Sequence, residues 1–110
     1  MTPRLTTDFW VTAYLARLEA AAIPAFLTAK GDPTAGAVII KVALMNGRAS
    51  AFHRVLGPDF ERVWAALSED EEERETDDAI ARQRNFDPDL WVIEIEDRQG
   101  RTLLEEDGLA

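Results

Sequence analysis

Apolar residues recur at helical spacing near the start of the chain. The stripe lies at positions i, i+1, i+4, i+5 and i+8 and consists of Trp10, Val11, Tyr14, Leu15 and Leu18. This spacing is typical of the buried face of an amphipathic helix. Thr6 or Thr7 suits the N-cap, and Pro24 cannot continue a helix. The pattern therefore predicts a helix over about residues 7–22, with its two large aromatic side chains in the core.

Alternating and continuous apolar runs follow, and they predict strands. Residues 25–30 form a short candidate strand, and the Gly- and Pro-containing segment 31–36 predicts a turn. Residues 37–45 form the clearest strand in this half of the chain. Asn46 and Gly47 come next, the dipeptide most typical of a two-residue hairpin turn. The sequence thus predicts an antiparallel hairpin centred on this dipeptide.

A two-residue turn fixes which side chains share a face of the hairpin. Met45 then pairs with Arg48, and Val38, Ile40 and Val42 occupy the core face with His53. The other face is half apolar and half cationic, and we interpret it as an interaction surface made of Ile39, Lys41, Met45, Phe52 and Arg54. His53 is the only histidine, so a histidine-rich metal site or a Ser-His-Asp triad has no second candidate.

The next segment fits two periods. Residues 60–67 match a helix at i, i+3, i+4 and i+7 but also alternate as a strand, and we choose the strand. Ser68 and Glu71 form a capping box, which predicts an acidic helix over about 69–85. Eight acidic residues in its first ten positions indicate a solvated face, and a docking site for a basic partner is the alternative.

The C-terminal part contains a strong strand at residues 90–96. Trp91, Ile93 and Ile95 point to one face and form an apolar row that belongs in the core. A turn at 98–100 predicts a short returning strand at 101–104, and residues 105–110 are expected to fray. Together these elements predict one α+β domain spanning residues 1–110. It has an N-terminal helix, a mostly antiparallel sheet of four to five strands, and a second, acidic helix before the last main strand.

Composition narrows the classes of function. The chain of 110 residues has no cysteine and a net charge of −9. Residues 1–58 carry six basic and three acidic residues, whereas residues 59–110 carry six basic and eighteen acidic ones. An acidic surface repels nucleic acid and anionic membranes, so neither is expected as a partner. With no apolar run of roughly 20 residues to span a bilayer, we expect a cytoplasmic protein.

Three carboxylates are candidates for a catalytic or metal site. Glu94 and Glu96 share a strand face about 7 Å apart, and Asp32 sits in the turn at 31–36. Together they could hold Mg²⁺ or another hard cation. Asp32 could instead close its turn by accepting backbone N–H groups, which is the more common use of aspartate there. Glu94 and Glu96 could equally form exposed ion pairs at a strand end.

Several segments resemble a known family. They are Arg4-Leu5, Trp10-Val11, the turn Gly31–Ala37 and the stretch Phe86–Arg98. The chain is similar over nearly its whole length to a family of small alphaproteobacterial proteins known as domain of unknown function 1491. The resemblance implies a single small intracellular bacterial domain. It implies no activity, no cofactor and no catalytic residues.

Two functions follow as expectations. The first is a non-catalytic interaction module, with itself as a homodimer or an unknown protein as the partner. It would use the surface defined above or an exposed strand edge. The alternative is a metal-dependent hydrolase or small-ligand enzyme that uses Asp32, Glu94 and Glu96. No resident cofactor is expected in the first case.

Overall fold

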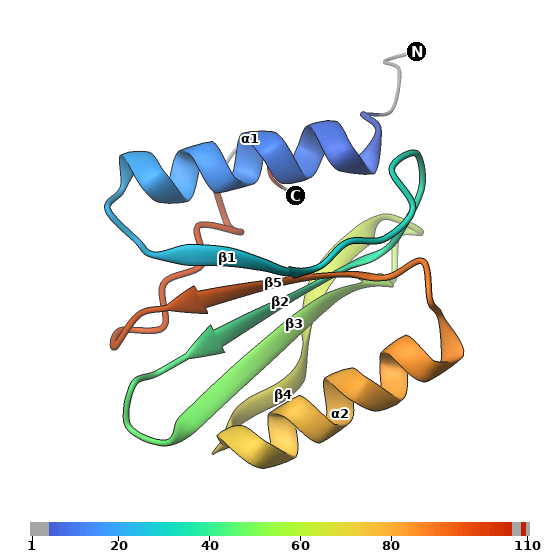
Figure 1. Ribbon diagram of the computed structural model, residues 1–110. Helices are drawn as coiled ribbons and strands as arrows, with labels where there is room; N and C mark the ends of the chain where they lie inside the picture. Colours follow the sequence, from blue (N-terminus) through green and yellow to red (C-terminus); the bar gives the residue numbers. More distant parts are fainter. Residues whose placement is uncertain (1–4, 107–108, 110) are drawn as a thin grey trace.

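A five-stranded sheet lies between two helices in the computed structural model, which describes residues 5–106 and 109 (Figure 1). The first helix covers one face of the sheet and the second helix covers the other. In chain order the elements are α1 (Thr7–Ala20), β1 (Ala25–Ala29), β2 (Val38–Ala43), β3 (Arg48–Leu56), β4 (Arg62–Glu72), α2 (Glu73–Phe86) and β5 (Trp91–Glu96). The predicted α+β class, with its N-terminal helix and its second helix before the last strand, is confirmed.

The order of strands in the sheet is β1-β5-β2-β3-β4. Three of the four pairings are antiparallel, as predicted, and β2 runs parallel to β5 with Val38 beside Trp91. The last strand therefore inserts between the first two. This insertion places the Trp91–Ile93–Ile95 row on an interior strand of the sheet, where Ile93 and Ile95 are fully buried.

Each helix covers its own hydrophobic cluster. The predicted stripe of α1 packs on the apolar row of β5 and on Ile40 and Val42 of β2. On the other face, Ile80 of α2 packs against Ile39, Ala51 and Val92. Alternation along β2 explains the division, because successive side chains of a strand point to opposite faces. The predicted core role of Trp10 and Tyr14 is confirmed, since both are buried.

The hairpin between β2 and β3 differs from its predicted register by one residue. Ala43 pairs with Ala49, and the amide of Leu44 donates to the carbonyl of Arg48 at 3.0 Å. The loop therefore contains Met45 as well as Asn46 and Gly47, and Met45 adopts a left-handed φ of 64°. A shift of one residue moves every side chain of β3 to the other face relative to β2.

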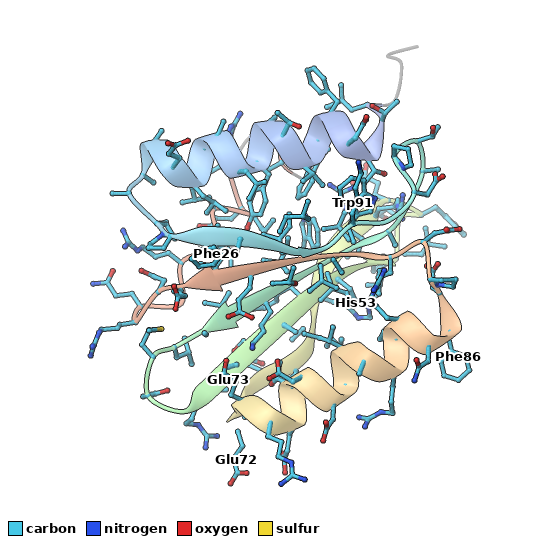
Figure 2. The ribbon with its side chains drawn as sticks, in the orientation of Figure 1. Phe26, His53, Glu72, Glu73, Phe86 and Trp91 are labelled. Atoms are coloured by element: carbon cyan, nitrogen blue, oxygen red, sulfur yellow. The ribbon has the colours of Figure 1, made fainter. Side chains whose placement is uncertain are left out.

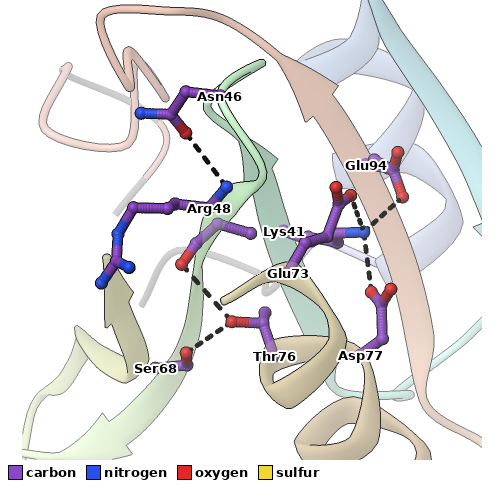
Figure 3. Close-up of polar contacts among 9 residues, drawn as sticks. Lys41, Asn46, Arg48, Ser68, Glu73, Thr76, Asp77 and Glu94 are labelled. Atoms are coloured by element: carbon purple, nitrogen blue, oxygen red, sulfur yellow. Dashed lines mark hydrogen bonds and ion pairs between the residues drawn. The ribbon is translucent and has the colours of Figure 1, made fainter. Parts of the chain in front are cut away.

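Strand β4 and helix α2 also differ from their predicted boundary. The choice of a strand over 60–67 is confirmed, but β4 continues to Glu72 and α2 begins only at Glu73. The capping-box prediction was wrong because Ser68 lies within β4 and pairs with Ala51 of β3. Its hydroxyl is buried and lies 2.7 Å from the hydroxyl of Thr76 in α2, which also donates to the carbonyl of Ala49 (Figure 3). The first acidic residues of the predicted helix thus belong to a strand.

The C-terminal segment packs more closely than predicted. Residues 101–104 form no strand, and the carbonyl of Thr102 accepts a hydrogen bond from the hydroxyl of Tyr14 at 2.7 Å. Leu109 is 2% exposed, and its carbonyl accepts a hydrogen bond from Nε1 of Trp64 at 3.1 Å. The expectation of a frayed tail over 105–110 is therefore wrong at Leu109, because an apolar anchor holds that residue in the core. Residues 107, 108 and 110 lie outside the described part of the chain.

Two glycines let the loop between β1 and β2 lie directly on the start of β5. A Cβ atom on Gly31 or Gly36 would overlap the carbonyl of Asp89 and come within 2.7 or 2.9 Å of the Trp91 ring. The amide of Asp32 donates to that same carbonyl at 2.9 Å. The predicted turn is confirmed, and its glycines are required by this close approach.

We expect Gly31→Ala to lower the free energy of unfolding by about 3 kcal/mol, because backbone atoms cannot move aside as a flexible side chain can. Urea unfolding followed by circular dichroism measures this change. Gly57→Ala is the control, since the nearest atom to its added Cβ would be the carbonyl oxygen of Glu61 at 3.2 Å. An equal loss in the two variants would contradict the proposed role of close packing at Gly31.

Candidate functional site

Asp32 closes its turn. Its side chain accepts hydrogen bonds from the amides of Thr34 and Ala35, at 3.2 and 2.8 Å. Its carbonyl accepts another from Nε1 of Trp91, at 2.7 Å. Both functions are structural, and the first is the turn-closing alternative expected for this residue type.

Glu94 and Glu96 lie away from Asp32 along β5. Asp32 bonds to Asp89, just before β5 begins, whereas Glu96 is the last residue of that strand. At about 3.3 Å per residue, Glu94 and Glu96 are roughly 10 and 17 Å further along than Trp91. In the described residues no group of three or more histidine, aspartate or glutamate side chains is placed to hold a metal ion. The structure therefore does not bring the three candidate carboxylates Asp32, Glu94 and Glu96 together.

Glu94 instead belongs to an ion cluster around Lys41 (Figure 3). The ammonium Nζ of Lys41 lies 2.7 Å from a carboxylate oxygen of Glu73, 2.7 Å from one of Asp77 and 3.2 Å from one of Glu94. The lysine side chain is only 5% exposed, whereas its three partners are 28–54% exposed. Strands β2 and β5 and helix α2 each contribute to this cluster, so it joins α2 to the sheet.

The cluster also sets the proton affinity of Lys41. Burial by itself lowers the pKa of an ammonium group, because it disfavours the charged form. Hydrogen bonds to Asp77, Glu73 and Glu94 outweigh burial here and raise the pKa of Lys41 above its ordinary value. Lys41 is therefore held as a cation and is unsuited to act as a base or a nucleophile near neutral pH.

The predicted interaction surface does not exist as one face. Ile39 and Lys41 are buried beneath α2, at 1% and 4% exposure. Phe52 and Arg54 lie on the α1 side of the sheet, and Met45 lies in the hairpin loop. The prediction was wrong because it used the two-residue turn, and the one-residue shift reverses the faces of β3.

The two edges of the sheet differ in charge. β1 forms one edge, and its five residues, Ala25-Phe26-Leu27-Thr28-Ala29, carry no charge. Phe26 and Leu27 are 50% and 43% exposed. β4 forms the opposite edge and contains five charged residues among eleven, with two irregularities in its pairing to β3. Charges and bulges are devices that keep edge strands from pairing with other chains, and only β4 has the charges.

A cavity of about 750 Å³ opens at the end of the sheet where β2 begins. The β2–β3 ladder stops at the Ile40–Phe52 pair, although both strands continue beyond it. Val38 and Ile39 on one strand, and His53 and Arg54 on the other, line the cavity together. The cavity therefore occupies a split between two neighbouring strands, and it is lined from both faces of the sheet.

The walls of this cavity differ in charge between the two faces. Arg54 stands on the α1 side, with its guanidinium 4.9 Å from the ring of Trp10 and 4.7 Å from that of Trp64. Arg62 lies two residues before Trp64 on β4 and so points to the same side. On the α2 side stand His53, visible in Figure 2, and Asp87 at the end of α2. The arginines and the aspartate thus approach the cavity from opposite faces.

Sequence reasoning missed this cavity for a local reason. Trp10 was expected only as a core residue, and the wrong register placed His53 on the same face as Val38, Ile40 and Val42. No sequence pattern marked Arg62 or Gln83 as part of a site. The cavity depends on where two strands separate, and no local pattern of residues marks that point.

Fold and site together define a small three-layer α+β domain whose sheet is split at one end. The family model described as "Protein of unknown function (DUF1491)" matches residues 5–105. The chain therefore belongs to the DUF1491 family, and the resemblance noted from its sequence segments is confirmed. The family description assigns no activity.

Solved structures of the family are similar over almost the whole chain. A crystal structure of a DUF1491 family protein from Caulobacter crescentus CB15 is 40% identical, with a TM-score of 0.84, and the match covers 94% of this chain and 97% of that one. An NMR structure of a DUF1491 family protein from the same organism is also 40% identical, with a TM-score of 0.82 and 96% of each chain covered. The solution structure of protein Atu0922 from A. tumefaciens is 30% identical, with a TM-score of 0.73 and 86% of each chain covered. Both organisms are alphaproteobacteria.

No match was found among the curated proteins. Within the described residues, neither helix is long and apolar enough to cross a membrane. The cytoplasmic location expected from the sequence stays a prediction.

Proposed function

We propose that this chain is a non-catalytic interaction module that forms a homodimer through the outer edge of β1. The observation that carries the proposal is the uncharged edge of that strand, with Phe26 half exposed and Leu27 nearly so. An edge strand presents a row of backbone donors and acceptors that a second strand can satisfy. This replaces the predicted face around Lys41 and keeps the predicted alternative of an exposed strand edge.

A second copy is a suitable occupant because the strand is self-complementary. Antiparallel pairing of two β1 strands around Leu27 would continue the sheet from one protomer into the other with two-fold symmetry. Phe26 lies on the α2 side with Glu94, and Leu27 lies on the α1 side with Ile93. Apolar side chains therefore flank the seam on both faces. Opposing this, each copy has a net charge of −9, so salt should strengthen the dimer by screening the repulsion.

Light scattering after size exclusion tests the proposal. The wild-type chain is expected at twice its monomer mass, with the dimer fraction rising as salt increases. Leu27→Lys places a charge at the centre of the pairing edge and should give a monomer, because two ammonium groups would then face each other across the seam.

Val63→Lys is the matched control. Val63 lies on the opposite edge strand and is 42% exposed, close to the 43% of Leu27, so the substitution adds the same charge at a similarly exposed apolar position. This variant should remain a dimer. A wild-type chain that stays monomeric at all salt concentrations would refute the proposal, and so would a dimer unaffected by Leu27→Lys.

A further inference from the structure

We propose that the cavity between β2 and β3 binds a short peptide with free termini, its carboxylate on the α1 side and its ammonium group on the α2 side. The cavity lies at the end of the sheet where β2 begins, and β1 is separated from β2 by β5. Peptide binding and self-association through β1 are therefore independent, and each can fail without the other.

The split in the sheet provides the backbone part of the site. β2 keeps its strand geometry at Val38 and Ile39, after its ladder with β3 has stopped at Ile40. On its other side this segment pairs with β5, so only its main-chain groups on the β3 side lack a strand partner. A peptide that crosses the split from one face of the sheet to the other can satisfy such a group with a backbone amide or carbonyl, and its two termini then reach the two faces.

The charges provide the orientation. Arg54 and Arg62 approach the cavity from the α1 side, and Asp87 approaches it from the α2 side. A simple anion would be attracted to the arginines but repelled by Asp87. A simple cation would be attracted to Asp87 but repelled by the arginines. A peptide with both termini free matches the two sides at once. An extended tripeptide spans about 10 Å, comparable to the spacing between packed layers of a fold.

The size and the polar lining of the cavity agree with such a ligand. Its volume of about 750 Å³ lies within the range typical of small-ligand sites. Trp10 lines it and is 6% exposed, and its Nε1 has no hydrogen-bond partner among the described residues. A buried donor without a partner is unfavourable, and a peptide carbonyl is a suitable acceptor for it.

Nuclear magnetic resonance titration of the full chain with trialanine tests the proposal. Backbone amide signals of Val38, Ile39 and His53 should shift in a saturable manner, with a Kd of roughly 1 mM. Titration to about 10 mM would then approach saturation. Amide signals of β1 are not expected to shift, which separates this site from the proposed dimer edge.

Blocked peptides and matched variants locate the two ends. Acetylation of the N-terminus should weaken binding to the wild-type chain about fivefold but should not weaken binding to Asp87→Asn further. Amidation of the C-terminus should likewise weaken binding to the wild-type chain but should not weaken binding to Arg62→Gln further. Asp87→Asn keeps the side-chain oxygen that accepts the amide of Asp89, so the turn after α2 is preserved.

Two exposed residues of α2 that do not line the cavity supply the controls. Arg74→Gln and Asp78→Asn make the same charge changes there and should leave the affinity for trialanine unchanged. The absence of saturable shifts up to about 10 mM would overturn the proposal. Chemical-shift changes confined to surfaces outside the cavity would also overturn it. The proposal would fail as well if the cavity variants weakened the binding of trialanine no more than the control variants do.

Discussion

Replacing Trp91 by alanine should lower the free energy of unfolding by about 3–5 kcal/mol. The ring is 2% exposed and lies in the cluster beneath α1 (Figure 2). Its removal would leave a void at the start of β5, bordered by the glycine loop that packs on the ring. It would also leave the carbonyl of Asp32 without the hydrogen bond that Nε1 donates at 2.7 Å. Both effects act in the same direction.

Thermal unfolding measures this change. For a domain of this size, the expected loss corresponds to a fall in melting temperature of more than roughly 10 °C. Phe86→Ala is the control, because Phe86 lies five residues earlier but is 90% exposed, and its loss should change stability by less than about 0.5 kcal/mol. Equal melting temperatures for the two variants would remove Trp91 from the core.

Trp91→Phe separates the ring from its hydrogen bond. Phenylalanine keeps most of the apolar volume but has no donor for the carbonyl of Asp32. We expect an intermediate loss of about 1–2 kcal/mol, the usual effect of leaving one buried acceptor without its partner. A loss as large as that of Trp91→Ala would place most of the stabilisation in the hydrogen bond.

Elements defined by their own periodicity were predictable from the sequence. The α1 stripe needs only the four-residue spacing of Trp10, Tyr14 and Leu18, and the β5 row needs only alternation. Both patterns bury one face whatever the rest of the chain does. The loop at residues 31–36 was equally clear, since its glycines, proline and aspartate favour a turn locally.

Features set by contacts between distant segments were not predictable. Asn46 and Gly47 favour a two-residue turn, but the observed three-residue loop places Phe52 and Arg54 on the α1 side, on the opposite face from Lys41. The capping box at Ser68 favours a helix locally, but pairing with the nine-residue strand β3 overrides this preference. Strand pairing and burial commonly override such local preferences. The parallel β2–β5 contact and the cavity likewise depend on the order of the strands in the sheet.

The candidate site shows the same division. Asp32 was correctly weighed as a turn residue, because the turn chemistry of aspartate is local. The grouping of Asp32 with Glu94 and Glu96 failed because it required two ends of one strand to meet. The cluster around Lys41 could not be found from sequence, since a lysine within an apolar strand gives no information about which distant acids surround it.

Lys41→Met should lower the free energy of unfolding by about 2–4 kcal/mol at neutral pH. Methionine is unbranched, only one atom shorter than lysine, and fills most of the same space, so most of the loss would come from charge. Removing one partner of a buried ion pair leaves the others uncompensated, and here three carboxylates would face one another without a cation. The effect is smaller than for a fully buried pair because Asp77 is about half exposed and can be hydrated.

A second set of substitutions separates repulsion from packing. Asp77→Asn combined with Lys41→Met removes one of the uncompensated charges and should recover part of the lost stability. Arg48→Met is the control for loss of an exposed cation. Arg48 is 46% exposed and pairs with Asp70, and such surface pairs contribute less than about 1 kcal/mol. A Lys41→Met variant no less stable than Arg48→Met would contradict the proposed role of the cluster.

The stabilisation by Lys41 should also depend on pH in one direction. Its pKa is raised in the folded state, so the folded chain holds the proton more tightly than the unfolded chain, whose lysine has a pKa of about 10.4. The contribution is therefore complete below about pH 10 and falls as pH rises through the folded pKa. Urea unfolding at pH 8 and pH 11 should show a smaller difference between wild type and Lys41→Met at the higher pH. A difference that stays constant would mean that the lysine stabilises the fold by packing alone, and a difference that grows would contradict the raised pKa of Lys41.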